Sequence, residues 1–535
     1  MKAFLMYRTR DFDSQQLLTR RERQTRSSRR SDAALDLRQI LPWNEQALRQ
    51  DLGLDVLCSA MAGGDGFLFE VAQAAVLSSL TDSQAIAYRQ HIIADALKNP
   101  VIVRAIYQIT VDAIEAERKN YWSFFSRYPG GTLHRSVDVM QMFSVMLKRL
   151  RKIADENADQ FASEGFSTLF AVLRRELSDD YFAEIERHLD RLKFRRGSLI
   201  SARLGKGNKG TDYVLRRPRD DERNWMARWL FDKEPAYTFT LHPRDETGAR
   251  ALAELNDRGV NLVANAIAQS TDHILSFFQM LQTELAFYIG CINLHERLSQ
   301  LGEPMCFPRP VSAGQRRLSF EALYDPALAL SMQAKVVGND LNGDNCDLVV
   351  ITGANTGGKS TFLRSVGIAH LMMQAGMFVP AQRFSAEVCE GVITHYRREE
   401  DAGMESGKWD EELARMSEIV DRLRPNSLVL FNESFSSTNE REGSEIAGQI
   451  VKAVLDRGVK VVFVTHLYRL ARTLVVERSD RARFLRADRR PDGSRPFRLV
   501  EGQPLETSFG EDLYRTIFAG RSDPRHAVNH HADKD

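Results

Sequence analysis

The sequence has little of what marks secreted, membrane-spanning or disulfide-stapled proteins. Cysteine is scarce, with 5 among 535 residues, and no two have the C-x-x-C spacing. This scatter gives no zinc site and indicates a reducing compartment. No apolar run approaches the roughly 18 residues of a membrane-spanning helix, and the opening Met-Lys-Ala-Phe-Leu-Met-Tyr-Arg has too short an apolar stretch for a signal peptide. We therefore predict a cytoplasmic protein with no membrane partner.

Net charge is also nearly absent, because 73 Lys and Arg residues oppose 72 Asp and Glu residues. The total charge of +1 says nothing about binding partners. Local charge is less even, since residues 1–30 hold nine Lys or Arg against three Asp or Glu. We interpret residues 1–34 as a basic arm, either disordered in solvent or in contact with phosphates. Residues 521–535 are expected to be a disordered tail.

Helical periodicity dominates the first part of the chain. A total of 535 residues allows about two to four domains, and 43% hydrophobic content allows a real core. Residues 35–305 are predicted to be helical, including a helix that begins near Ser83 and ends at Asn99-Pro100. Apolar residues recur from 261 to 300 at the spacing of one long helix, which could be a lever between distant parts or an ordinary core helix.

A basic insertion at about 193–245 interrupts these helices. Leu199–Leu204 and Tyr213–Leu215 flank a glycine-rich stretch, which predicts a β-hairpin, and 237–241 reads as a further strand. Nine Lys and Arg in 193–219 oppose a single acid, Asp212. Such a charge density suits a nucleic-acid phosphate backbone better than base edges, although a solubilising loop is the alternative. The candidate DNA-contacting residues are Arg203, Lys206, Lys209, Arg216 and Arg217.

Residues 348–361 carry the strongest signal. An apolar run predicts a buried strand and leads into the pattern G-x-x-x-x-G-K-[ST]. Glycines let backbone N–H groups curl around phosphates where a side chain would block the approach, and the N-terminus of the next helix favours the same anion. Lys359 can reach the β- and γ-phosphates and Ser360 can bind Mg²⁺. The candidate ATP-binding residues are Gly353, Ala354, Asn355, Thr356, Gly357, Gly358, Lys359, Ser360 and Thr361.

Strands and helices alternate from 306 to 520, which predicts a mostly parallel sheet covered by helices on both faces. A second apolar strand, Leu428–Phe431, ends in Asn432-Glu433. Phosphoryl-transfer sites place here the residues that hold Mg²⁺ and orient water. We assign Asn432 with Ser360 to Mg²⁺ and Glu433 to the water. His466 ends a later strand and is a candidate γ-phosphate sensor, although such a histidine can also be a local hydrogen-bonding residue.

These motifs together resemble the ATPase domain of the MutS family of DNA mismatch repair proteins. The resemblance is strong over about 320–515 and weaker over about 50–305. It implies an α/β P-loop ATPase domain of the ABC-like kind at 306–520, joined to an all-α core and lever region at 35–305 that carries the small β-containing insertion. It also implies ATP and Mg²⁺ as cofactors, with Lys359, Glu433 and His466 as catalytic residues. The matching residues are Gly353–Thr361, Phe378–Ala381, Ser434–Thr438, Gly443, Thr465-His466 and Ser508-Phe-Gly510.

The resemblance further implies a homodimer in which each ATP site takes a segment from the partner subunit. That segment matches Ser406, Gly407, Lys408 and Trp409, with Gly407 where the family has serine. Asn432 stands where the family has aspartate, and the lost charge near Mg²⁺ predicts slow turnover. The chain is too short for the family's mismatch-reading domain. The Phe-x-Glu sequence Phe182-Ala183-Glu184 falls in a predicted helix, where we assign it to core packing.

The expected function is that of a DNA-binding ATPase, in which ATP binding and hydrolysis at a dimer interface switch a helical clamp on double-stranded or branched DNA. The setting would be DNA repair or the control of recombination. The alternative is a nucleotide-gated scaffold with little hydrolysis that binds protein partners rather than DNA. An ATPase of the chromosome-maintenance or transporter kind is disfavoured, because the sequence has no Leu-Ser-Gly-Gly-Gln stretch and no long heptad array.

Overall fold

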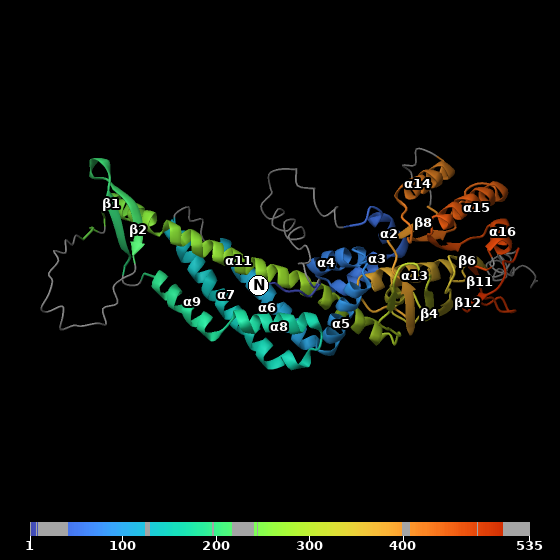
Figure 1. Cartoon of the computed structure of the whole chain (residues 1–535), viewed down its shortest axis with the longest axis horizontal. Coiled ribbons are helices and arrows are strands. Elements are labelled where there is room, and N and C mark those ends of the chain that lie inside the picture. The colour runs from blue at the N-terminus through green and yellow to red at the C-terminus, as the bar shows by residue number, and fades with distance from the viewer. Residues whose placement is uncertain are drawn as a thin grey trace, which may run out of the picture. The chain divides into compact units, whose positions relative to one another are not determined.

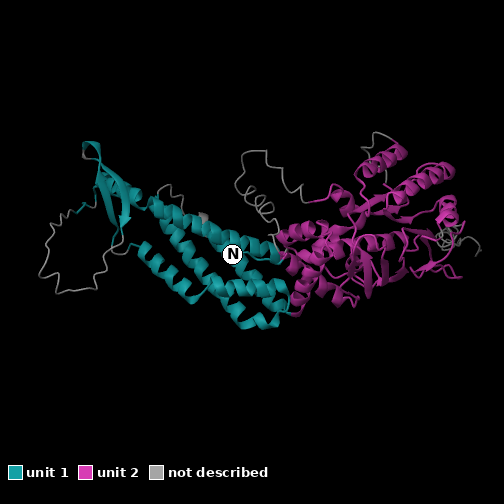
Figure 2. Cartoon of the chain, in the orientation of Figure 1, with its two compact units in different colours: residues 1–5, 9–18, 99–285 teal, residues 6–8, 19–98, 286–535 magenta. Residues whose placement is uncertain are grey.

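The protein is helix-rich with mixed sheets in the computed structural model shown in Figure 1. The structure describes residues 2–6, 8, 41–122, 129–194, 197–216, 240–242, 244–398, 407–478 and 480–506. The chain divides into two compact units, drawn in teal and magenta in Figure 2. Beyond the first eight residues, unit 1 contains described residues from 99–285 and unit 2 contains described residues from 41–98 and 286–506.

Unit 1 is built from long helices that share a buried apolar face. Leu133, Val137 and Met140 recur along one face of α7 and pack with Leu189 and Val260 of two other helices. Phe182 of the Phe-x-Glu sequence is 5% exposed and contributes to this unit's buried residues, as predicted. The helices are α6 (Pro100–Trp122), α7 (Pro129–Asn157), the 3₁₀ turn η2 (Ala158–Gln160), α8 (Glu164–Glu176), α9 (Asp179–Leu192) and part of α11 (Glu246–Gln300).

The predicted long helix and basic hairpin are both confirmed. Helix α11 is continuous over 55 residues and begins at Glu246, earlier than the predicted 261. Strands β1 (Leu199–Leu204) and β2 (Gly210–Arg216) pair antiparallel, with the 3₁₀ turn η3 (Lys206–Asn208) at the tip. Ile200 packs on α11 at Gly259, where an added Cβ would lie 2.5 Å from Ile200 Cδ1. A side chain at position 259 would therefore require the Ile200 side chain to shift.

The strand predicted at 237–241 lies mostly outside the described residues. Of residues 237–241, the first three lie outside the described residues, and Thr240 and Leu241 have no regular secondary structure. Helix α11 begins only a few residues later, and Asp245 Oδ1 accepts from Gly248 N at 2.8 Å near its start. The described end of this segment leads into α11, and the strand at 237–239 stays a prediction.

The central sheet of unit 2 has six strands in the order β12-β11-β6-β10-β9-β8. All pairs are parallel except β11 with β12. Most of the strand residues are Val, Leu, Ile or Phe and are buried, as a parallel sheet covered on both faces requires. The strands are β6 (Leu348–Gly353), β8 (Val392–Tyr396), β9 (Leu428–Asn432), β10 (Lys460–Val464), β11 (Ala482–Ala487) and β12 (Leu499–Glu501).

Helices cover this sheet closely. Gly367 of α13 has no room for a side chain, because an added Cβ would lie 2.7 Å from Leu430 Cδ1 and 2.8 Å from Leu52 Cδ2. The helix that follows Asp82 is capped by the Asp82 carboxylate, which accepts from two backbone N–H groups. The helices of unit 2 are α2 (Glu45–Leu52), α3 (Leu54–Ala62), α4 (Gly66–Leu77), α5 (Ser83–Lys98), α12 (Pro326–Met332), α13 (Lys359–Gln374), α14 (Lys408–Arg422), α15 (Glu440–Asp456), α16 (Tyr468–Arg478) and the end of α11.

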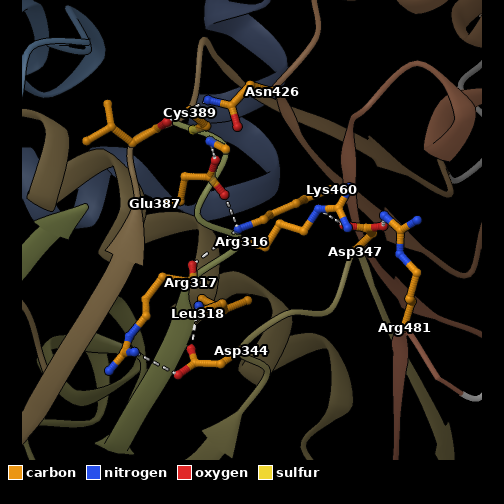
Figure 3. Close-up of polar contacts among 12 residues, drawn as sticks. Arg316, Arg317, Leu318, Asp344, Asp347, Glu387, Cys389, Asn426, Lys460 and Arg481 are labelled. Carbon is orange, nitrogen blue, oxygen red and sulfur yellow. Dashed lines mark hydrogen bonds and ion pairs between the residues drawn. The ribbon is translucent and has the colours of Figure 1, made fainter. Parts of the chain in front are cut away.

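A second, four-stranded sheet in the order β3-β7-β4-β5 was not predicted. Its strands are β3 (Arg309–Val311), β4 (Leu318–Leu323), β5 (Asn339–Asn342) and β7 (Arg383–Glu387). Figure 3 shows a polar network beside it: Lys460 Nζ lies 2.5 Å from Glu387 Oε2 and donates to Arg317 O at 3.2 Å, and Arg316 and Arg481 both pair with Asp347. Lys460 begins β10 and Glu387 ends β7, so this network joins the two sheets at the amino ends of the parallel strands.

The start of the predicted basic arm is packed rather than disordered. Ala3, Leu5 and Met6 are at most 1% exposed. Within unit 1, Leu5 N donates to Glu284 Oε2 at 2.6 Å, and within unit 2, Met6 O accepts from Arg89 Nε at 2.9 Å. The prediction of disorder is therefore wrong for residues 2–6, because their apolar side chains are buried and their backbone groups are hydrogen-bonded. Residues 9–34 and the predicted tail at 521–535 lie outside the described residues.

All five cysteines are free. In the described part of the chain, no helix is both long and apolar enough to cross a membrane.

Candidate functional site

The loop from Gly353 to Gly358 connects β6 to α13 and is lined by backbone. Gly353 and Gly358 have φ values of 106° and 90°, which strongly favour glycine. At Gly357 an added Cβ would lie 2.6 Å from Ala487 Cβ and 2.9 Å from Ala354 O. Side chains are therefore excluded at these glycines, and the loop curls at the N-terminus of a 16-residue helix, where backbone N–H groups and the helix dipole favour an anion.

Lys359 occupies the inside of this loop. Its Nζ donates to Gly353 O at 3.1 Å and to Ala354 O at 2.9 Å, and the residue is 5% exposed. Burial lowers the pKa of Lys359 to about 8; the nearby Glu433 carboxylate opposes this shift and the Arg495 cation adds to it. The ammonium is thus held beside the loop with neutral carbonyl partners, and a phosphate would be a stronger partner for it.

We expect the affinity for a nucleoside triphosphate to fall as pH rises above about 8, the free-state pKa of Lys359. Phosphate contact raises that pKa, so binding requires a charged lysine, and each pH unit above the free value costs up to about tenfold in affinity. Binding titrations with a fluorescent ATP analogue at a series of pH values from about 7 to 9 measure this fall in affinity. The variant Lys359→Met should bind the analogue weakly, and its affinity should not fall over this pH range. An equally steep fall in that variant would contradict the assignment of the pH dependence to Lys359.

The other residues of the candidate site follow the carboxyl ends of β9 and β10. Ser360 Oγ donates to Asn432 Oδ1 at 2.9 Å, which joins the start of α13 to the end of β9. Glu433 N donates to Val464 O at 2.8 Å, and Glu433 Oε1 lies 3.0 Å from His466 Nε2. Parallel pairing of β6 with β10 and of β10 with β9 puts these strand ends at one edge of the sheet.

Glu433 is held as a carboxylate. The hydrogen bond from His466 lowers the pKa of Glu433 below its ordinary value, burial opposes this shift, and the charges of Lys359 and Arg397 add to it. Its backbone is also unusual, with φ at 54° in the left-handed region. An ionised carboxylate at this position can accept a proton at neutral pH.

The sequence analysis did not identify Arg495, which lies against the loop from Gly353 to Gly358. Arg495 Nη1 donates to Thr356 Oγ1 at 2.5 Å, and an added Cβ on Gly358 would lie 3.5 Å from Phe497 Cβ. Asn339 of β5 fixes this segment, since its side chain bonds Phe497 O and Leu499 N. The arginine-rich stretch between β11 and β12 was the available signal, but its proximity to residue 356 depends on tertiary structure.

The predicted partner-contacting segment is only partly described. Gly407 and Lys408 lie at the start of α14, and Ser406 lies outside the described residues. The Trp409 ring is 6.5 Å from the Phe435 ring and packs on the core of its own unit. Part of the Trp409 ring is therefore used in packing within its own chain, and the rest is accessible.

The basic side chains of the hairpin project into solvent. Arg203 is 84% exposed in its side chain and lies 4.0 Å from Asp212, a weak surface pair. Lys206 and Lys209 are exposed at the tip. Arg216 Nε donates to Ser201 Oγ at 2.8 Å. Arg217 lies outside the described residues, so the structure brings four of the five predicted residues together on one hairpin.

Comparison with known proteins gives two family matches. Residues 81–301 match the MutS2 N-terminal domain, and residues 349–515 match MutS domain V. The DNA mismatch repair protein MutS of Methanosarcina mazei is 27% identical over 220 residues, covering 40% of this chain and 24% of that protein. The MutS protein of Thermotoga maritima is 38% identical over 135 residues, covering 25% of this chain and 17% of that protein. The chain thus matches a quarter or less of these two relatives' length.

Proposed function

The chain belongs to the MutS family, and from that premise we propose that it is a DNA-binding ATPase. ATP binding and hydrolysis would take place in an ABC-like P-loop domain at a homodimer interface. The helical region would act as a clamp that this cycle switches on DNA, in repair or in the control of recombination. The observation that carries the proposal is the convergence of Lys359, the Ser360–Asn432 pair and the Glu433–His466 pair around one backbone-lined loop.

The residues fit ATP with Mg²⁺. The backbone loop suits the phosphates, and Ser360 Oγ with Asn432 Oδ1 offers the hard oxygen ligands that Mg²⁺ prefers. Among the residues that the structure describes, no cluster of three His, Cys, Asp or Glu side chains forms another metal site. When bound, Mg²⁺ would neutralise charge on the β- and γ-phosphates.

The mechanism assigns one task to each residue. Lys359 would exchange its bonds to Gly353 O and Ala354 O for the β- and γ-phosphates. Glu433 would accept a proton from the water that attacks the γ-phosphorus, while the bond from that phosphorus to the β,γ-bridging oxygen breaks to give ADP and phosphate. His466 would hold the Glu433 carboxylate through their 3.0 Å contact and report the γ-phosphate. Residues 406–409 would contribute to the partner's site.

We expect Asn432→Asp to raise kcat roughly tenfold and to lower the Mg²⁺ concentration needed for half-maximal activity, because a carboxylate restores a charge near the metal position. Steady-state ATPase assays over a Mg²⁺ series measure both quantities. Asn439→Asp is the matched control: it adds the same charge at the N-cap of α15, where the side chain accepts from Glu442 N in either form. An Asn432→Asp variant with unchanged kcat and unchanged Mg²⁺ dependence would contradict the assignment of Asn432 to the metal.

Asn432 also favours a second candidate, a nucleotide-gated scaffold. A neutral amide beside Ser360 leaves the loop and Lys359 able to bind ATP while weakening turnover. A single-turnover assay with excess protein separates the two candidates. Conversion of bound ATP to ADP supports the ATPase, whereas stable binding without conversion, together with indifference to DNA, supports the scaffold.

A further inference from the structure

The turn that carries Glu433 is strained. Glu433 and Phe435 have φ values of 54° and 65°, both in the left-handed region that non-glycine residues avoid. A bulky residue in such a conformation is energetically unfavourable and persists only where its surroundings hold it. Phe435 is 0% exposed, and Gly443 of α15 lies so close that an added Cβ would be 2.4 Å from Phe435 O. The surroundings of this turn therefore determine where the Glu433 backbone lies.

Two buried residues from other elements hold the turn. Glu412 of α14 is 2% exposed, and its Oε1 accepts from Phe435 N at 2.7 Å, a bond to the strained residue itself. His395 of β8 is 0% exposed and stacks on the Phe435 ring at 5.3 Å and 14°. Its Nδ1 lies 2.8 Å from Ser434 Oγ. Its Nε2 lies 3.1 Å from Glu412 O, so one imidazole bridges α14 and the turn.

We propose that Glu412 is a positioning residue for Glu433. By binding Phe435 N it keeps the turn in the conformation that presents the Glu433 carboxylate to the phosphate loop, with His395 and Ser434 completing the support. This inference rests on the proposed ATPase function. A purely structural role would alter stability and leave kcat in the folded fraction unchanged, whereas a positioning role alters kcat with little change in KM.

The test compares Glu412→Ala with Glu412→Gln in full-length protein. The alanine removes the acceptor for Phe435 N, and a displaced base is expected to lower kcat about 10- to 100-fold with KM within about twofold. Glutamine retains an acceptor oxygen and should restore kcat to within about fivefold of wild type. Glu418→Ala removes a carboxylate from the same helix at an exposed ion pair with Arg422 and should have no effect on kcat.

Ser434→Ala provides a second variant in case Glu412→Ala does not fold. It removes the hydroxyl that contacts His395 Nδ1 and is expected to lower kcat about three- to tenfold with KM unchanged. Fluorescent ATP binding measures the folded, binding-competent fraction by which each kcat is normalised. Wild-type kcat in the folded variants, or a loss confined to KM, would overturn the positioning role. Absence of ATPase activity in the wild type would instead refute the proposed hydrolytic function.

Discussion

Glu433→Gln is expected to lower kcat for ATP hydrolysis by about 10²- to 10⁴-fold, the usual contribution of a general base. ATP affinity should be unchanged or tighter, because the substitution removes a negative charge near Lys359 and the phosphates. The glutamine preserves side-chain volume and can still contact His466, whose Nε2 lies 3.0 Å from Glu433 Oε1. Single-turnover kinetics with radiolabelled ATP, together with equilibrium binding, would separate the chemical step from nucleotide capture.

The matched control for this prediction is Glu445→Gln. Glu445 is an exposed residue on α15, the helix that follows the Glu433 turn, and the same charge is removed there. It should hydrolyse ATP like the wild type. Wild-type hydrolysis in Glu433→Gln would show that another group accepts the proton, and an equal loss in Glu445→Gln would point to a general charge effect.

Reversing the charges of Arg203, Lys206 and Lys209 to glutamate is expected to weaken DNA binding about 10²- to 10³-fold at moderate salt. If each cation neutralises one phosphate, the slope of log affinity against log salt should become less negative by about 0.9 for each lost contact. The three side chains are exposed on one hairpin, so the folded structure of unit 1 should tolerate the change. Fluorescence anisotropy with homoduplex, mismatched and branched DNA over a salt series measures both effects.

A control triple variant carries the same total charge change elsewhere in unit 1. Lys119, Lys152 and Arg187 lie exposed on α6, α7 and α9, away from the hairpin sequence. Reversing these three should leave most of the affinity and the salt slope intact. Equal losses in the two triple variants would assign the binding to overall charge, and no loss in the hairpin variant would leave the solubilising-loop interpretation.

Much of the candidate site could be predicted from sequence because its parts are local. A β-branched run, a glycine loop and a following lysine specify strand, loop and helix within residues 348–361. The two later strands are short apolar runs, and each is followed by polar residues of the candidate site, Asn432 and Glu433 after the first and His466 after the second. Parallel pairing then brings separate strand ends to one edge of the sheet. Ser360, Asn432, Glu433 and His466 can therefore be predicted to lie close together, as the structure places them.

The parts that sequence could not provide depend on tertiary contacts. The bond between Arg495 and Thr356 joins residues 139 positions apart. The support of Phe435 by Glu412 and His395 brings together α14, β8 and the turn after β9, which are separate in the sequence. The four-stranded sheet was missed because β3 and β5 are only 3 and 4 residues long, too short for a period-two signal. Disorder was wrongly predicted for residues 2–6, because the prediction rested on the charge of the whole arm and not on the apolar side chains of this short segment.

The most direct test of this account is calorimetric titration of the purified protein with ATP and Mg²⁺ at neutral pH, repeated with Lys359→Ala. The account predicts saturable binding at up to one nucleotide per chain in the wild type and a loss of at least about 100-fold in affinity in the variant, since a buried charge-assisted phosphate contact is removed. No detectable binding to the wild type, or equal affinity in the two proteins, would contradict the claim that the loop from Gly353 to Gly358 holds a triphosphate.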